Sequence, residues 1–125
     1  MPTALVVEDE ARNTALLDAI LVLAGYRMVA VDNLAEARSR LQSGDAQPDV
    51  VLLDRHLGDG DGLDLARWIR SSGPRPGVPI ILVSASVLPT DQDEAIAAGC
   101  DAFVPKPIRV DPLIAQIRTL VPAEA

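Results

Sequence analysis

Several side chains that can bind a metal ion or a phosphate group follow hydrophobic runs of the sequence. They are Glu8 and Asp9 after residues 4–7, Asp54 after 50–53, Ser84 after 80–83 and Lys106, the only lysine, after 102–104. If these runs are parallel strands, their carboxyl ends share one edge of a sheet, and ligands bind at that edge. We therefore expect three carboxylates, a hydroxyl and an amine to converge there.

This combination of groups favours phosphoryl chemistry that depends on a metal ion. Carboxylates that lie close together repel one another unless a cation neutralises them. Oxygen ligands suit a hard divalent cation, and we expect Mg²⁺. A lysine can neutralise the other side of a phosphoryl group, and the carboxylate nearest to both cations could itself be the nucleophile that forms an acyl phosphate.

Five hydrophobic runs alternate with segments of helical spacing. The runs cover residues 4–7, 27–31, 50–54, 80–84 and 102–104. Because they are continuously apolar rather than alternating, they are typical of parallel strands covered by helices on both faces. The sequence therefore predicts one doubly wound α/β domain. Its last helix is expected to start with Asp111 as N-cap and Pro112 in the first helical position.

Residues 58–62 alternate glycine with aspartate but do not fit a nucleotide-binding loop. The pattern G-x-G-x-x-G would need glycine at the position of Leu63, and Asp59 and Asp61 would repel a pyrophosphate. We interpret the segment as a solvated loop that opens the third helix.

Composition excludes several classes of protein. The 125 residues make one domain, and 49% hydrophobic residues are too many for a disordered chain. The longest apolar stretch, residues 15–24, is interrupted by Asp18 and is too short to span a membrane, and no signal peptide is visible. Single residues of Cys (Cys100) and His (His56) exclude a disulfide and a Cys/His zinc site. The net charge of −7 opposes nonspecific nucleic-acid binding. Because no signal peptide is visible and there is a single cysteine, we expect a cytoplasmic protein.

Four motifs, in this order, resemble the receiver domain of bacterial two-component response regulators. They are LVVEDE (5–10), VVLLDRHLGDGDGLDL (50–65), IILVSAS (80–86) and AGCDAFVPKPI (98–108), and the resemblance covers almost the entire chain. It implies a flavodoxin-like (βα)5 fold with a parallel five-stranded sheet in the order 2-1-3-4-5. It also implies a single receiver domain over residues 1–125 with no output domain, either stand-alone or part of a hybrid kinase or longer regulator.

The resemblance assigns a role to each residue singled out above. Asp54 matches the phosphoacceptor. The other implied roles are Mg²⁺ ligation by Glu8, Asp9, Asp54 and the backbone carbonyl of His56, switching by Ser84, Lys106 and Phe103, and tuning of the phosphoryl lifetime by His56 and Ser86.

The implied function is a signalling switch rather than an enzyme, since the domain catalyses only its own phosphorylation and dephosphorylation. A sensor histidine kinase or a histidine phosphotransfer protein would donate the phosphoryl group. The surface of the fourth helix, fifth strand and fifth helix would then bind a downstream protein target. Ala102 and Gln116 replace the acid and the arginine of one family dimer, so we expect a monomer or a weak homodimer.

The same residues also bear on three other functions. A haloacid-dehalogenase-type phosphatase needs a second acid two residues after its nucleophile, whereas Asp54 is followed by Arg55 and His56. A flavodoxin-like electron carrier is disfavoured because the acids at positions 8–10 would repel a flavin phosphate. A pseudo-receiver, which binds proteins without being phosphorylated, stays open as the main alternative.

Overall fold

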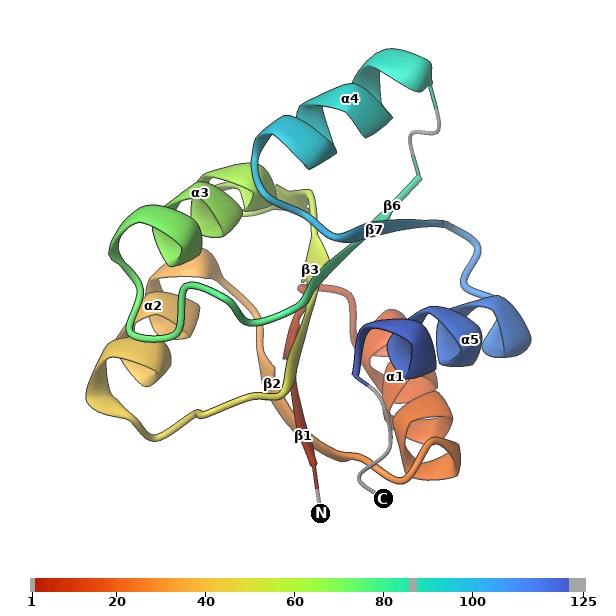
Figure 1. Cartoon of the computed structure of the whole chain (residues 1–125). Helices are drawn as coiled ribbons and strands as arrows, with labels where there is room; N and C mark the ends of the chain where they lie inside the picture. The colour runs from red at the N-terminus through yellow and green to blue at the C-terminus, as the bar shows by residue number, and fades with distance from the viewer. Residues whose placement is uncertain (1, 86–87, 122–125) are drawn as a thin grey trace.

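Five parallel strands form the central sheet (Figure 1). The structure is a computed structural model that describes residues 2–85 and 88–121. The strands are β1 (Thr3–Val7), β2 (Arg27–Val31), β3 (Val50–Asp54), β6 (Ile80–Ser84) and β7 (Ala102–Pro105). Their order is β2-β1-β3-β6-β7, and all neighbouring pairs are parallel. Counted within this sheet alone, that is 2-1-3-4-5, so the predicted flavodoxin-like winding is confirmed.

The hydrophobic runs form the middle of the sheet because both of its faces are covered. Every residue of β3 and β6 is buried, whereas β2, at the edge, exposes Arg27 and Ala30. Successive side chains of a strand point to opposite faces. In β1, Leu5 therefore packs in one hydrophobic cluster, and its neighbours Ala4 and Val6 pack in the other.

The helices are divided between the two faces of the sheet. On one face lie α1 (Ala11–Leu23) and α5 (Val110–Leu120), and on the other lie α2 (Leu34–Ser43), α3 (Gly62–Ser72) and α4 (Pro89–Ala97), as Figure 1 shows. The molecule thus has three layers with a hydrophobic cluster on each side of the sheet. In the part of the chain that the structure describes, no helix combines the length and apolar character needed to cross a membrane.

The start of α5 differs from the prediction. The helix begins at Val110, and Arg109 occupies the N-cap position without a side-chain cap hydrogen bond. Asp111 lies in the first turn, where the positive end of the helix dipole favours an acid. Pro112 is tolerated in that turn because its missing N–H would have no partner within the helix. The assignment of Asp111 as N-cap was wrong because both residue types also suit the first turn.

A short antiparallel hairpin follows β3, where residues 58–62 were interpreted as part of a solvated loop. Its strands are β4 (His56–Leu57) and β5 (Gly60–Asp61). Asp59, at the tip, is exposed as expected, but its carboxylate accepts hydrogen bonds from the N–H groups of Leu34 and Ala35 at 2.9 and 3.1 Å. The hairpin is therefore fastened to the start of α2.

The hairpin leads directly into α3. Asp61 is the N-cap of this helix, and its carboxylate accepts a hydrogen bond from the N–H of Leu63 at 2.9 Å. The N–H of Gly62 donates to the carbonyl of Arg55 at 2.7 Å, and a Cβ on Gly62 would collide with the carbonyl oxygen of Asp54. Glycine at this position therefore lets α3 begin against the end of β3.

Candidate functional site at the carboxyl edge of the sheet

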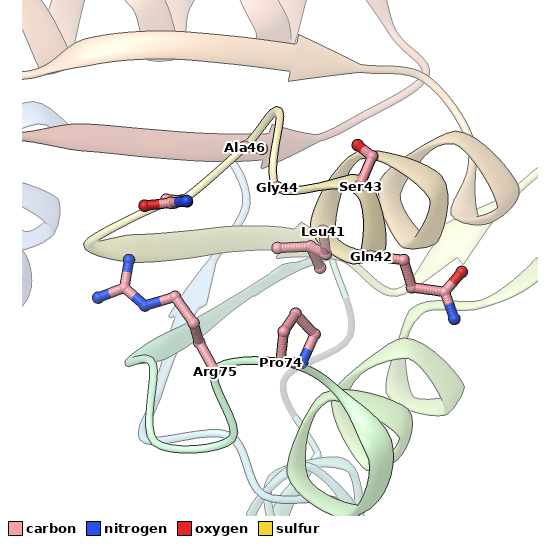
Figure 2. Close-up of a pocket in the computed structure, with 8 residues that line it drawn as sticks. Leu41, Gln42, Ser43, Gly44, Ala46, Pro74 and Arg75 are labelled. Carbon is pink, nitrogen blue, oxygen red and sulfur yellow. The ribbon is translucent and has the colours of Figure 1, made fainter.

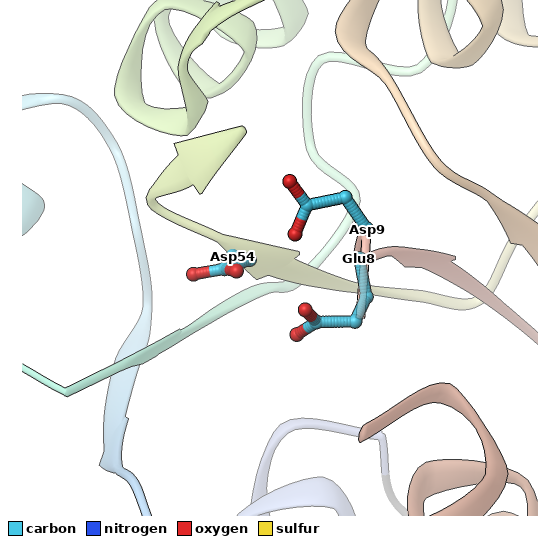
Figure 3. A group of neighbouring side chains, drawn as sticks. All are labelled: Glu8, Asp9 and Asp54. Atoms are coloured by element: carbon cyan, nitrogen blue, oxygen red, sulfur yellow. The ribbon is translucent and has the colours of Figure 1, made fainter. Parts of the chain in front are cut away.

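Three carboxylates meet where β1 and β3 end (Figure 3). Carboxylate oxygens of Glu8, Asp9 and Asp54 lie within 4.8 Å of one another. Glu8 and Asp54 are only 4% and 6% exposed, whereas Asp9 is exposed to solvent. The structure therefore brings together the three acids that the sequence placed at strand ends.

The register of the sheet explains why these acids are close. Val7 of β1 pairs with Leu53 of β3, so Glu8 and Asp54 follow at the same level of neighbouring strands. The Oε1 atom of Glu8 accepts a hydrogen bond from the N–H of Glu10 at 3.1 Å. This bond fixes the Glu8 side chain at the turn that leads from β1 into α1.

Lys106 lies directly after β7 and joins the same cluster. Its Nζ atom is 3.1 Å from Oδ2 of Asp54 and 3.3 Å from Oε2 of Glu8. The N–H of Lys106 donates to the carbonyl of Ser84 at 2.9 Å, which ties the end of β7 to the end of β6. The peptide bond between Lys106 and Pro107 is cis. The ammonium group of Lys106 thus forms ion pairs with two of the three carboxylates.

Burial and charge act in opposite directions on this site. Burial raises the pKa of Glu8, and the charge of Asp54 raises it further. The hydrogen bond from Glu10 and the charge of Lys106 lower this pKa, but the net shift is upward. Burial alone would lower the pKa of Lys106, but the hydrogen bond and charge of Asp54 and the charge of Glu8 outweigh burial, so its pKa is raised. The ammonium form of Lys106 is therefore stabilised beside the carboxylates.

The donor atoms of the cluster fit a hard divalent cation. All three side chains offer carboxylate oxygens, and one of them, Asp9, is open to solvent on the side where water ligands could enter. His56, whose backbone carbonyl is the fourth expected ligand, lies on β4 next to the site, and its N–H donates to Oδ1 of Asp54 at 3.4 Å. The His56 side chain is exposed.

The remaining expected site residues have different surroundings. Ser84 ends β6, is 1% exposed and lies in register with Pro105, so it is next to the strand end that carries Lys106. Phe103 of β7 is half-buried and packs against the hydrophobic cluster on the α2, α3 and α4 face. Ser86 lies outside the described residues.

One charged residue beside the site was not singled out by the sequence analysis. Arg55 follows Asp54 directly, and its guanidinium forms ion pairs with Asp61, Asp91 and Glu94. The only sequence signal for this cluster of ion pairs was an arginine next to the expected phosphoacceptor. The acids that pair with it lie up to 39 residues further along the chain. Sequence spacing alone did not reveal the pairing.

A pocket of about 330 Å³ lies elsewhere, at the amino edge of the sheet (Figure 2). It is formed by the end of α2 and by the segments that precede β3 and β6, including Leu41, Pro74 and Arg75. None of the residues expected to act in phosphoryl chemistry lines this pocket. The acidic cluster at the opposite edge is therefore the candidate functional site.

Comparison with known proteins agrees with this geometry. The sequence model of the family described as response regulator receiver domain matches residues 4–118. The chain belongs to this family. The receiver is 37% identical over 116 residues to the transcriptional regulatory protein KdpE of Staphylococcus aureus, a match that covers 93% of this chain and 48% of KdpE. It is 27% identical over 117 residues to the polar-differentiation response regulator DivK of Brucella anthropi, covering 94% of each chain. The receiver thus spans about half of one relative and nearly all of the other.

Solved structures of receivers have the same fold. A putative response regulator from Chloroflexus aurantiacus superposes with a TM-score of 0.89 at 23% identity, covering 98% of this chain and 100% of the other. The receiver domain of a sensor histidine kinase from Pseudomonas aeruginosa superposes with a TM-score of 0.83 at 28% identity, covering 98% of both chains. The latter structure has a magnesium ion coordinated in its active site cleft.

Proposed function

We propose that this receiver accepts a phosphoryl group on Asp54 and thereby switches the surface formed by α4, β7 and α5. The donor is the phosphohistidine of a sensor histidine kinase or of a histidine phosphotransfer protein. The observation that carries the proposal is the position of the Asp54 carboxylate, 3.1 Å from the Lys106 amine and within 4.8 Å of two further acids.

The transfer exchanges one bond for another. An oxygen of the Asp54 carboxylate attacks phosphorus, a P–O bond forms, and the P–N bond to the donor imidazole breaks with its electron pair remaining on nitrogen. Lys106 places a positive charge beside Oδ2 of Asp54, and so would stabilise the negative charge of the phosphoryl group as it arrives.

Glu8, Asp9, Asp54 and the backbone carbonyl of His56 would hold a Mg²⁺ ion. When bound, the ion would neutralise the carboxylates and the phosphoryl oxygens. Glu8 is buried and hydrogen-bonded to the backbone, so it keeps the cluster in place, whereas exposed Asp9 provides a ligand at the solvent side. The magnesium ion in the active site cleft of the Pseudomonas receiver supports this assignment.

The switch would act through the two strand ends that lie next to Asp54. Ser84 ends β6 and Lys106 follows β7, and the two are tied by the hydrogen bond from the Lys106 N–H to the Ser84 carbonyl. A phosphoryl group adds charge and strong acceptors at this point. Movement of Ser84 and Lys106 toward it would shift α4 and β7, the strand that carries half-buried Phe103. The altered surface would then bind a downstream protein.

The proposal is tested by intact-mass spectrometry after incubation with acetyl phosphate, with and without Mg²⁺. We expect one phosphoryl group on the wild-type protein only when Mg²⁺ is present, and none on Asp54→Asn. Asp64→Asn, which removes an exposed acid from α3, is the matched control and should be phosphorylated like the wild type. A wild-type protein that stays unmodified would instead support the pseudo-receiver alternative.

A further inference from the structure

The first turns of α4 have little apolar contact with the core. Ala95 is the one buried residue of this helix, whereas α3 buries several large side chains. Ile96 is 70% exposed, and Leu88, just before the helix, is 62% exposed. Further buried side chains follow only after the helix, at Ala98 and Cys100. Because burial of one alanine contributes little hydrophobic stabilisation, other contacts must hold the start of α4.

Arg55 provides such contacts. Its Nη1 atom is 3.2 Å from Oδ1 of Asp91, its Nη2 atom is hydrogen-bonded to Glu94, and its Nε atom is 3.6 Å from Oδ1 of Asp61. Asp91 and Glu94 lie one turn apart on α4, so both face the same guanidinium. The Arg55 side chain is only 14% exposed, which shields these pairs from solvent more than ordinary surface ion pairs.

The backbone of Arg55 is fixed as firmly as its side chain. Its carbonyl accepts the hydrogen bond from Gly62 at the start of α3, and its side chain reaches Asp61, the N-cap of that helix. The preceding residue is Asp54, the last residue of β3. A single residue therefore links the end of β3 to both α3 and α4.

We propose that Arg55 is a positioning residue that holds the first turns of α4 against the end of β3, and that phosphorylation of Asp54 weakens this hold. The inference rests on the proposed function. The acyl phosphate carries up to about two negative charges where the Asp54 carboxylate carried one, so phosphorylation adds about one negative charge at the residue next to Arg55. This new anion competes with Asp91 and Glu94 for the guanidinium, so α4 is released while α3 stays capped.

Competition for one guanidinium has a testable consequence. Removing one of the competing acids on α4 should favour phosphorylation, whereas removing the guanidinium should loosen α4 without favouring it. Arg55→Gln removes the cation, and Glu94→Gln removes one of its exposed partners on α4. Asp93→Asn is the matched control, because it removes the same charge from the neighbouring position of α4, and Asp93 is not among the ion-pair partners of Arg55.

Two measurements test the inference on the full chain. Hydrogen–deuterium exchange reports the opening of α4, and intact mass reports the acetyl phosphate concentration that phosphorylates half of the protein. We expect Arg55→Gln and Glu94→Gln to speed exchange in α4, each by roughly two- to fivefold, the range for partly exposed ion pairs. Only Glu94→Gln should also lower that concentration, because Arg55→Gln removes the cation for which the phosphoryl group competes. Asp93→Asn should change neither. Phosphorylation should speed α4 exchange in the wild type but not in Arg55→Gln.

Two results would overturn the inference. One is unchanged α4 exchange in untreated Arg55→Gln, and the other is an equal effect of phosphorylation on α4 in wild type and Arg55→Gln. Failure of the proposed function itself is seen separately, as a wild-type protein that takes up no phosphoryl group. In that case phosphorylation cannot loosen α4 either. Comparison of α4 exchange rates between untreated wild type and untreated Arg55→Gln would still decide whether Arg55 holds α4.

Discussion

At the scale of single residues, Lys106 balances a site that is otherwise acidic. Its amine lies between Asp54 and Glu8, two carboxylates that are nearly inaccessible to solvent. Without the amine, both acids would be buried next to a like charge. The same residue that would neutralise a phosphoryl oxygen therefore also stabilises the fold.

Substitution of Lys106 tests this charge balance. We expect Lys106→Met to lower the free energy of unfolding by about 1–3 kcal/mol, the cost of leaving buried acceptors without a donor. Urea unfolding in the absence of divalent cations measures the change. Arg118→Met removes the same charge from an exposed position of α5 and should cost less than about 0.5 kcal/mol. Equal losses in the two variants would contradict a local role for Lys106.

Cys100 makes a second prediction at this scale. The thiol is 7% exposed, and burial raises its pKa to about 11. Only the thiolate reacts with iodoacetamide, so at pH 8 the native protein should be alkylated roughly a hundredfold more slowly than the urea-unfolded chain. The native rate should rise about tenfold per pH unit as the pKa is approached from below. Mass spectrometry at several pH values follows the reaction, and similar native and unfolded rates would show that the thiol is accessible.

At the scale of elements, the β4–β5 hairpin connects the end of β3 to three helices. Asp59 fastens it to the start of α2, Asp61 caps α3, and Arg55, just before the hairpin, reaches α4. Each of these links is polar and joins residues that are far apart in sequence or lie on different elements. The hairpin and Arg55 together therefore position these helices around β3, and the hairpin also carries His56.

The close contact at Gly62 makes this connection sensitive to one methyl group. A Cβ there would strike the Asp54 carbonyl, which cannot move without shifting β3, so we expect Gly62→Ala to lower the free energy of unfolding by about 1–3 kcal/mol. A Cβ on Gly77, in the loop before β6, would meet no atom within 4 Å. Thermal and urea unfolding should show little change for Gly77→Ala, and a similar loss in both variants would argue against the steric explanation.

At the scale of the whole molecule, the site exists only when the sheet is assembled. Glu8 and Asp9 follow β1, Asp54 ends β3, and Lys106 follows β7, so three separate segments must pair before the cluster forms. A cation that binds this cluster binds the folded chain and not the unfolded one. Its binding is therefore coupled to global stability.

This coupling predicts that Mg²⁺ stabilises the protein. At a concentration of a hundred times its Kd, a ligand of the folded state adds about 2.7 kcal/mol to the free energy of unfolding. We expect Mg²⁺ to raise the urea midpoint of the wild type at constant ionic strength, and to have little effect on Asp9→Asn. Because Asp9 is exposed, this variant should fold normally without the ion. If Mg²⁺ raised the urea midpoint of Asp9→Asn as much as that of the wild type, Asp9 would not be a ligand of the metal site.

Much of the fold could be predicted because its signals are local. Continuous apolar runs indicated buried parallel strands, and the runs at 50–54 and 80–84 are indeed buried throughout. The order of strands followed from the resemblance carried by four motifs. The start of α5 was predicted wrongly because Asp111 and Pro112 suit both the cap and the first turn of a helix.

By itself, the sequence determined which residues end strands, and hence which side chains meet at the carboxyl edge. Strand formation depends on the polarity of consecutive residues, and parallel pairing then aligns the strand ends. Only the tertiary structure decided which groups the other charged side chains contact. Arg55 pairs with Glu94, and Asp59 accepts a hydrogen bond from the start of α2. Such pairs depend on the distance between elements after packing, and no local pattern of residue types encodes that distance.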